Sequence, residues 1–379
     1  MLTLKEISLV KVAAGFLSDS DTRRIINDFK EKVWKKALRE EMSGLGIPLT
    51  LHEEIIPLIK PIKLDVDYWI KDHNGIFTTE QECSLEFFFN GDGTVDRIKT
   101  ADSLIYSEWL SVTTRFVLAC EYLSRRDILT FFKNLPEAER NKILHEYSEG
   151  NKELNKHEEK VVQWITHYKE GCISESQPSG CNRYRYNWTD VSVQSRLLDD
   201  LSKEDCNILL DALFESTKEM HVGRFCLSRM SADHREQLLT RFPAKVLSIY
   251  LFRPYHNFFL DAADKVWDLL PENHFICLIH VIIYSKIFAL WSDFDYVELL
   301  RQFWQRSPDH LKLCVEGICI SEILRKTIKH GWHVKQHLRH RSFFSLVNPC
   351  NNHVNSSENI TLDMLWGKFI RKQGKHKNN

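Results

Sequence analysis

The chain has 379 residues, more than the roughly 250–300 at which one compact hydrophobic core stops growing, so two or three lobes or one elongated stack are expected. Apolar residues make up 43% of it and aromatic residues 11%, which excludes a largely disordered chain. The 14 glycines and 10 prolines are too few for the many turns of an all-β protein, so the composition favours helices.

Cysteine use and apolar patterning indicate where the protein resides. The ten cysteines stand at scattered spacings, some within apolar runs such as Phe116–Cys120, as expected of reduced thiols that pack as small apolar side chains. The first residues carry charge where a secretory signal needs an apolar stretch. His280 and Lys286 interrupt the longest apolar runs before they reach the roughly 20 residues that span a bilayer. We expect a cytoplasmic or nuclear protein that is neither secreted nor bound to a membrane.

The first predicted elements are two helices over residues 3–17 and 21–41. Six apolar side chains in the second segment fall on one helical stripe: Ile25, Ile26, Phe29, Val33, Trp34 and Leu38. Thr50 and Glu53 have the spacing of a capping box at the start of a further helix. Pro57 and Pro61 are expected to keep that helix short.

Residues 83–98 are the one strand-like exception. Apolar runs at 84–89 and 94–98 flank the sequence Asn90-Gly91-Asp92-Gly93. Asn-Gly and Asp-Gly between apolar runs are strong hairpin signals. The sequence therefore predicts a small β-hairpin near residues 84–98, or a sharp turn in its place.

Helices resume at Thr100, and Val112, Phe116, Ala119 and Leu123 are predicted to share one face. An aromatic residue followed by three residues, a proline and an acid then recurs at 132–137, 267–272 and 304–309, with a weaker copy ending at Pro243. The proline suits the first turn of a following helix, and the acid suits the positive start of that helix. The last two copies are 37 residues apart, a period typical of helical-pair repeats.

These patterns predict an all-α fold, an irregular α-helical repeat in which helical pairs stack like a solenoid. Five regions are expected: an N-terminal helical lobe (1–99), a repeat segment (100–170), a linker (171–192), a C-terminal repeat lobe (193–345) and a polar, basic tail (346–379). The residues expected in the core are Phe116, Cys120, Trp267, Leu270, Leu300 and Trp304.

Three stretches of the chain resemble a family of uncharacterised arachnid proteins. They are Gly93–Ala101, Arg115–Tyr122 and Leu135-Pro136, and the similarity extends over most of the chain. The resemblance implies an α-helical repeat fold. It implies no activity.

Two stretches imitate metal sites. Residues 88–99 place Asn90, Asp92 and Gly93 as in a calcium loop, but Phe88 and Lys99 occupy the first and twelfth positions, where calcium needs carboxylates. A plain turn is therefore preferred.

The second stretch, Cys314, Cys319, His333 and His337, has nearly the spacing of a zinc site. Residues 311–324, however, have the pattern of a buried helix, on which cysteines five apart point about 140° away from each other. Structural thiols are preferred.

A second group of histidines, His330, His333, His337 and His340, would share one side of a continuous helix and could bind a metal or respond to pH. No acid lies between Arg325 and Arg341 to orient them, so a solvated basic helix is preferred. No cofactor is expected.

Charge is uneven, although the whole chain carries only −1. From Arg325 onwards eleven Lys and Arg residues stand against two acids, which gives +9 and leaves −10 for the preceding 324 residues. Six basic residues are candidates for binding an anionic partner such as nucleic acid: Lys335, Arg339, Arg341, Lys368, Arg371 and Lys372. The alternative is that a basic end neutralises the acidic body.

Stacked helices expose an extended surface that suits another chain, so the leading hypothesis is a non-catalytic protein-interaction module or scaffold. A nucleic-acid-associated protein acting through its basic C-terminal region is the alternative. An enzyme is a lesser one, because the chain has no phosphate-binding glycine loop and no Gly-X-Ser-X-Gly elbow. The sequence sets no oligomeric state.

Overall fold

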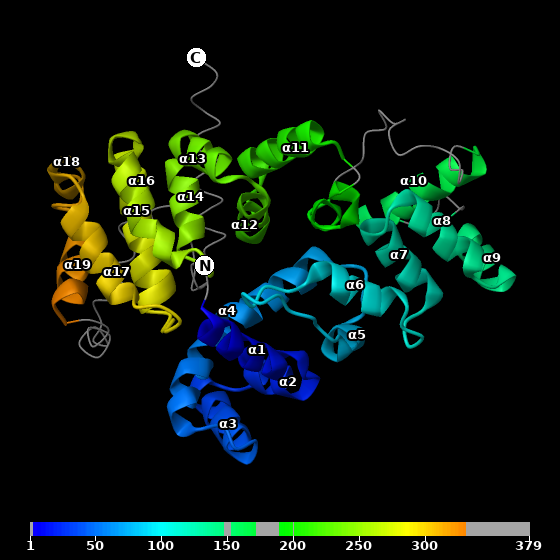
Figure 1. The fold of residues 1–379 in the computed structure, drawn as a ribbon, viewed down its shortest axis with the longest axis horizontal. Coiled ribbons are helices and arrows are strands. Elements are labelled where there is room, and N and C mark those ends of the chain that lie inside the picture. The colour runs from blue at the N-terminus through cyan, green and yellow to red at the C-terminus, as the bar shows by residue number, and fades with distance from the viewer. Residues whose placement is uncertain (1–2, 148–152, 172–188, 200, 331–379) are drawn as a thin grey trace. The chain divides into compact units, whose positions relative to one another are not determined.

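A computed structural model describes residues 3–147, 153–171, 189–199 and 201–330 of the chain (Figure 1). In these ranges there are 19 α-helices and no β-strand, so the prediction of an all-α fold is confirmed. The stacking of helical pairs as repeats stays a prediction. Contacts divide the chain into two compact units, residues 1–212 and 213–379. None of the helices described is both long enough and apolar enough to cross a membrane.

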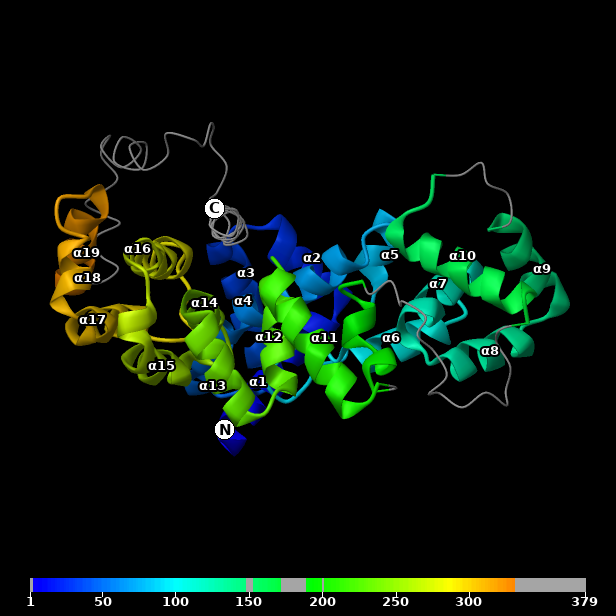
Figure 2. The ribbon, with the colours of Figure 1, turned by 90° about the horizontal axis from the view of Figure 1, so that it is seen from above.

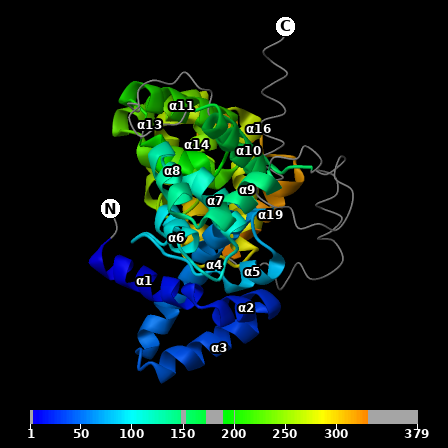
Figure 3. The same cartoon turned by 90° about the vertical axis from the view of Figure 1, so that its right-hand side faces the viewer.

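The described part of unit 1 contains ten α-helices, two short 3₁₀ helices and most of α11. Their bounds are α1 (Leu4–Ser18), α2 (Ser20–Asp28), α3 (Glu31–Gly44), α4 (Leu49–Asp72), α5 (Thr79–Ser84), α6 (Arg97–Ile105), α7 (Val112–Tyr122), α8 (Arg125–Asn134), α9 (Glu137–Glu146), α10 (Lys156–Lys169), η1 (Ser192–Gln194), η2 (Arg196–Leu198) and α11 (Lys203–Ser216). One apolar core lies among α1 to α4 and a second among α4 to α10. Figure 3 shows α1, α2 and α3 beside one another, with α2 packed against both of its neighbours.

Helix α4 belongs to both cores and is far longer than predicted. Pro57 and Pro61 lie inside its 24 residues and do not end it. Each proline removes a helical hydrogen bond and costs about 3 kcal/mol or more. The helix stays continuous because its buried face, which includes Ile59, packs in one core and Trp69 packs in the other, and each such side chain contributes roughly 2 kcal/mol. Glu53 forms an ion pair with Arg39 and does not cap a helix at Thr50.

The helix predicted over 21–41 is broken into α2 and α3. Phe29 and Lys30 are extended, which shifts the helical phase of everything after them. As a result Phe29 and Val33 are exposed, whereas Trp34 and Leu38 are buried as the pattern predicts. The predicted face of α7, with Val112, Phe116 and Ala119, is buried as well.

Residues 84–98 form a turn with a single antiparallel bridge between Phe89 and Val95, so the small hairpin is reduced to its tightest part. Ser84 ends α5, and Arg97 already begins α6. The last four residues of the predicted linker, 189–192, pack within unit 1. There Val191 and Ser192 have no exposed surface.

Unit 2 consists of the end of α11 and the elements α12 (Met220–Arg229), α13 (Ala232–Arg241), α14 (Pro243–Tyr250), η3 (His256–Phe258), α15 (Phe259–Val266), η4 (Trp267–Leu269), α16 (Glu272–His280), the π-helix η5 (Val281–Ile287), α17 (Tyr296–Arg306), α18 (Asp309–Leu313) and α19 (Cys319–His330). Helix α14 packs against α13, α15 and α16, as Figure 2 shows. Helix α17 packs against α15 and α19.

The recurring proline marks a helix start each time it is followed by an acid. Pro136, Pro271 and Pro308 lie immediately before α9, α16 and α18, and the acid is the first helical residue. Pro243, which lacks the acid, is instead the first residue of α14. The sequence pattern thus identifies where helices begin. It does not by itself show that helical pairs repeat.

Two of the predicted core residues are not core residues. Phe116, Cys120, Leu270 and Leu300 are buried, but Trp267 and Trp304 are only half-buried. The indole N–H of Trp267 donates to the Asp264 carboxylate at the surface, and the indole ring packs against the ring of Phe303. Phe303, with no exposed surface, occupies the core position next to Trp304.

The buried helix predicted over 311–324 is also wrong. Gly317 has a φ of +81°, a conformation that L-residues with a side chain rarely adopt, and it separates α18 from α19. Cys314 and Cys319 therefore do not lie on one continuous helix, and the 140° separation expected of them does not apply.

Candidate functional site

A surface groove of about 530 Å³ lies in unit 1, between α1 and an extended segment of chain. One wall is α1, with Lys11, Ala14, Gly15 and Ser18. The other wall is the segment 86–90, and Asp19, Ser20 and Ser84 line one end. A volume of this size is within the range of ligand-binding clefts.

A buried arginine fixes the two walls relative to each other. Arg23 of α2 donates to the carbonyl oxygens of Leu17 and Ser18 at the end of α1, each at 2.8 Å. The same guanidinium donates to the carbonyl oxygens of Cys83 and Leu85 at the start of the opposite wall. Its planar fork of donors suits four oxygens at once, so the groove is closed at this end by hydrogen bonds from one side chain.

The extended wall presents a backbone edge to the groove. Phe89 and Val95 form an antiparallel pair flanked by the bonds from Asn90 N to Thr94 O and from Asp96 N to Phe88 O. In this arrangement the N–H and C=O groups of the paired residues point away from each other. Val95 N donates to the Asp65 carboxylate at 2.6 Å. Phe89 N and O have no hydrogen-bond partner among the described residues.

The unpaired groups of Phe89 face the α1 side. On a strand, alternate residues direct their backbone groups to the same edge. Two residues before Phe89, the carbonyl of Phe87 accepts a hydrogen bond from Ser18 Oγ of α1 at 3.1 Å. Two residues further back, the carbonyl of Leu85 accepts from Arg23. Side chains of α1 and α2 thus bind the carbonyl oxygens of Leu85 and Phe87 and leave both backbone groups of Phe89 open.

The turn that carries this edge is held on its other side. Asp92 Oδ1 accepts from Thr94 N and Oγ1, and Thr100 Oγ1 accepts from Phe88 N at 3.1 Å. Gly93 has a φ of +88°, and a Cβ there would lie 2.9 Å from Ile62. The edge is therefore preorganised.

Two neighbouring features open the groove to a ligand. Gly15 is exposed on α1, and a Cβ built there would meet nothing within 4 Å. Phe88 is 43% exposed on the opposite wall. Because Gly15 has no side chain, another chain can approach the α1 wall closely. The exposed ring of Phe88 offers that chain an apolar contact on the opposite wall.

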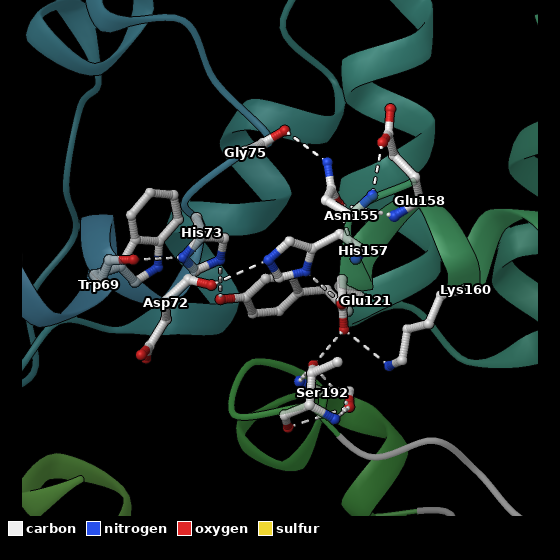
Figure 4. A network of polar contacts seen from close by, with 12 residues as sticks. Trp69, Asp72, His73, Gly75, Glu121, Asn155, His157, Glu158, Lys160 and Ser192 are labelled. Atoms are coloured by element: carbon white, nitrogen blue, oxygen red, sulfur yellow. Dashed lines mark hydrogen bonds and ion pairs between the residues drawn. The ribbon is translucent and has the colours of Figure 1, made fainter. Parts of the chain in front are cut away.

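A buried network of charges joins α4, α7 and α10 within unit 1 (Figure 4). The carboxylate of Glu121 in α7 accepts from His157 Nδ1 at 2.6 Å, from Lys160 Nζ at 2.8 Å and from Thr189 Oγ1 at 2.8 Å. Burial alone would raise the pKa of Glu121, but the hydrogen bonds and charges of His157 and Lys160 lower it to about 2. The other nitrogen of His157 lies 3.1 Å from the carbonyl oxygen of Asp72.

A second histidine of the network is neutral. His73 Nδ1 donates to Trp69 O at 2.6 Å, and Nε2 accepts from the Tyr122 hydroxyl at 2.9 Å. Burial lowers the pKa of His73 to about 3. Glu121, His157, His73 and Tyr122 have no exposed surface, so these four side chains join α4, α7 and α10 without meeting solvent, and the half-buried Thr189 adds the segment before η1.

Unit 2 has its own buried charge at Lys286, on the π-helix. Nζ lies 3.7 Å from the centroid of the Phe252 ring and 3.8 Å from that of Trp291. No described residue offers this nitrogen a hydrogen bond, and the Asp293 carboxylate oxygen Oδ2 is also without one. Burial lowers the pKa of Lys286 to about 7 and raises that of Asp293.

The structure places few of the predicted site residues. Asn90 and Asp92 bind Thr94 within the turn, and no cluster of three or more potential metal ligands occurs in the described ranges. Cys314 lies after α18 and bonds Leu311 O, and His330 ends α19. The remaining predicted positions lie outside the described residues: Lys335, Arg339, Arg341, Lys368, Arg371, Lys372, His333, His337 and His340.

Sequence reasoning missed the groove, although one signal was present. Gly15 interrupts an apolar helix at an exposed position, where glycine costs about 1 kcal/mol relative to alanine and offers no packing in return.

No protein-family model, curated protein or solved structure matches this chain. The resemblance to an arachnid family stays a prediction.

Proposed function

We propose that the protein is a non-catalytic interaction module that binds a segment of another protein in the groove between α1 and residues 86–90. The observation that carries the proposal is the unpaired backbone edge at Phe89, which lies in a groove whose walls are fixed by Arg23. Exposed strand edges recruit peptide segments through main-chain hydrogen bonds. The nucleic-acid alternative rests on residues outside the described ranges and stays a prediction.

The test blocks the groove without altering the fold. Because the space above Gly15 is empty, Gly15→Leu fills the groove and also removes a helix-weakening glycine, so the variant is expected to fold at least as stably as the parent. Gly44→Leu is the matched control, since Gly44 is also an exposed helical glycine of unit 1 with nothing within 4 Å, and it does not line the groove.

The probe is a phage-displayed library of random linear peptides selected on the full-length protein. We expect selected peptides to bind the parent and the Gly44→Leu variant equally and to lose at least tenfold in affinity for Gly15→Leu. Failure to select any peptide, or equal binding by both variants, would remove the proposal.

A further inference from the structure

We propose that the groove takes its partner as an added β-strand, antiparallel to residues 86–90, with an acidic residue followed four positions later by a basic one. This inference rests on the proposed function and adds the binding mode and the charge pattern of the partner.

The open backbone edge extends over two residues of the wall. Phe89 offers both an N–H and a C=O, and the N–H of Phe87, which faces the same edge, also has no hydrogen-bond partner among the described residues. A residue placed opposite Phe89 in an antiparallel strand exchanges two hydrogen bonds with it, and the next residue of the same register reaches Phe87. Antiparallel pairing is the slightly more stable arrangement per residue.

The two ends of the groove carry opposite charges. Asp19 and Glu86 are exposed and both act electrostatically on Arg23, so they lie at the closed end. Lys11 is exposed, lines the groove and has no ion pair within the described residues. Because Ser18 contacts Phe87 while Ile7 faces Gly91, α1 runs opposite to the extended wall, and Lys11 lies toward Asn90.

The spacing of these charges sets the spacing in the peptide. Lys11 lies within α1 and Asp19 is the C-cap of that helix, eight residues further on, which is about 12 Å at the helical rise of 1.5 Å per residue. Four residues of an extended strand span about 13 Å. An acid facing Lys11 and a base facing Asp19 and Glu86 are therefore four residues apart, on the same face of the peptide, and the antiparallel direction puts the acid first.

The experiment compares two phage libraries of identical composition, Glu-X-X-X-Lys and Lys-X-X-X-Glu, on the full-length protein. We expect the first library to be enriched at least tenfold over the second. The double variant Lys11→Glu with Glu86→Lys exchanges two exposed charges without touching the core and is expected to reverse the preference.

The backbone is tested on a synthetic peptide from the first library, with each amide nitrogen methylated in turn. Strand addition predicts at least a tenfold loss of affinity at alternate amides and little change at those between, because only every second amide faces the edge. Uniform sensitivity, or a charge preference that survives the exchange, would overturn this binding mode. Peptides that are selected without charge order yet lose binding to Gly15→Leu would overturn it while leaving the proposed function intact. Self-association of the full chain that Gly15→Leu abolishes, with no library enriched, would assign the groove to a second copy and overturn both.

Discussion

Replacing Lys286 by methionine should stabilise unit 2, and the gain should depend on pH in a defined way. In the unfolded chain a lysine has a pKa of about 10.5, whereas burial lowers that of Lys286 to about 7. Folding therefore favours the neutral amine, so this side chain's contribution is fully present above pH 10.5 and is lost as the pH falls through that value toward 7. At about 1.4 kcal/mol for each pKa unit, the folded state is disfavoured at pH 7 by about 4 kcal/mol.

The measurement is urea unfolding of the parent and of Lys286→Met at a series of pH values. Between pH 7.5 and 9.5 the advantage of the variant should shrink by about 2.5 kcal/mol, because groups that do not interact with Lys286 cancel in the difference. The rings of Phe252 and Trp291 offset part of the cost by attracting the ammonium, which lowers the absolute gain without changing this trend. Lys218→Met, at an exposed lysine of the same unit, is the control and should show no such trend. An advantage that stays constant over this range would refute the reasoning.

Three further predictions concern stability. Glu121→Gln should cost about 3–5 kcal/mol in urea unfolding, because it breaks a buried charge network. Since the folded pKa of Glu121 is about 2 against an ordinary 4.5, the parent should lose about 3 kcal/mol as the pH falls from 4.5 through 2, and a variant with the same acid sensitivity would contradict the assignment. Gly93→Ala should cost at least 2 kcal/mol by thermal unfolding, from strain at φ +88° and the contact with Ile62, whereas Gly46→Ala, at φ +72° in open space, should cost only about 1 kcal/mol; equal costs would argue against that contact. Phe303→Ala should cost about 3–5 kcal/mol in chemical denaturation and Trp267→Ala clearly less, so the reverse order would contradict the burial of these two rings.

The sequence predicted helices well and their ends unevenly, for identifiable reasons. The apolar positions predicted to share one face of α7 are buried, but so is nearly every other residue of that helix, because it is surrounded by neighbouring helices. Periodicity failed at Phe29, where two extended residues reset the helical phase, and at Gly317, whose positive φ breaks a helix without any loss of apolar pattern. Pro57 and Pro61 led to the opposite error. The low helix propensity of proline predicted that this helix would be short, but its packing in two apolar cores keeps it continuous.

The candidate site was harder to predict than the helices, because it depends on unpaired backbone groups and not on a side-chain motif. Hairpin signals at Asn90-Gly91 located the turn, and the turn is present. They could not show which backbone groups of Phe89 remain unpaired, since that depends on Arg23, 66 positions away in the chain, binding the neighbouring carbonyls.

The position of Arg23 also explains why the groove remains open where it does. A guanidinium donates hydrogen bonds and accepts none, so Arg23 can satisfy carbonyl groups along the edge and never its N–H groups. The hydroxyl hydrogen of Ser18 is likewise directed at carbonyl oxygens, that of Phe87 at 3.1 Å and that of Ala14 at 3.2 Å. The edge is left with more unpaired donors than acceptors, at Phe87 N, Phe89 N and Phe89 O. A peptide backbone supplies both carbonyl acceptors and an N–H donor at the spacing of a β-strand. The side chains of Arg23 and Ser18 that close one end of the groove thus leave, at Phe89, a pattern of groups that suits an extended chain.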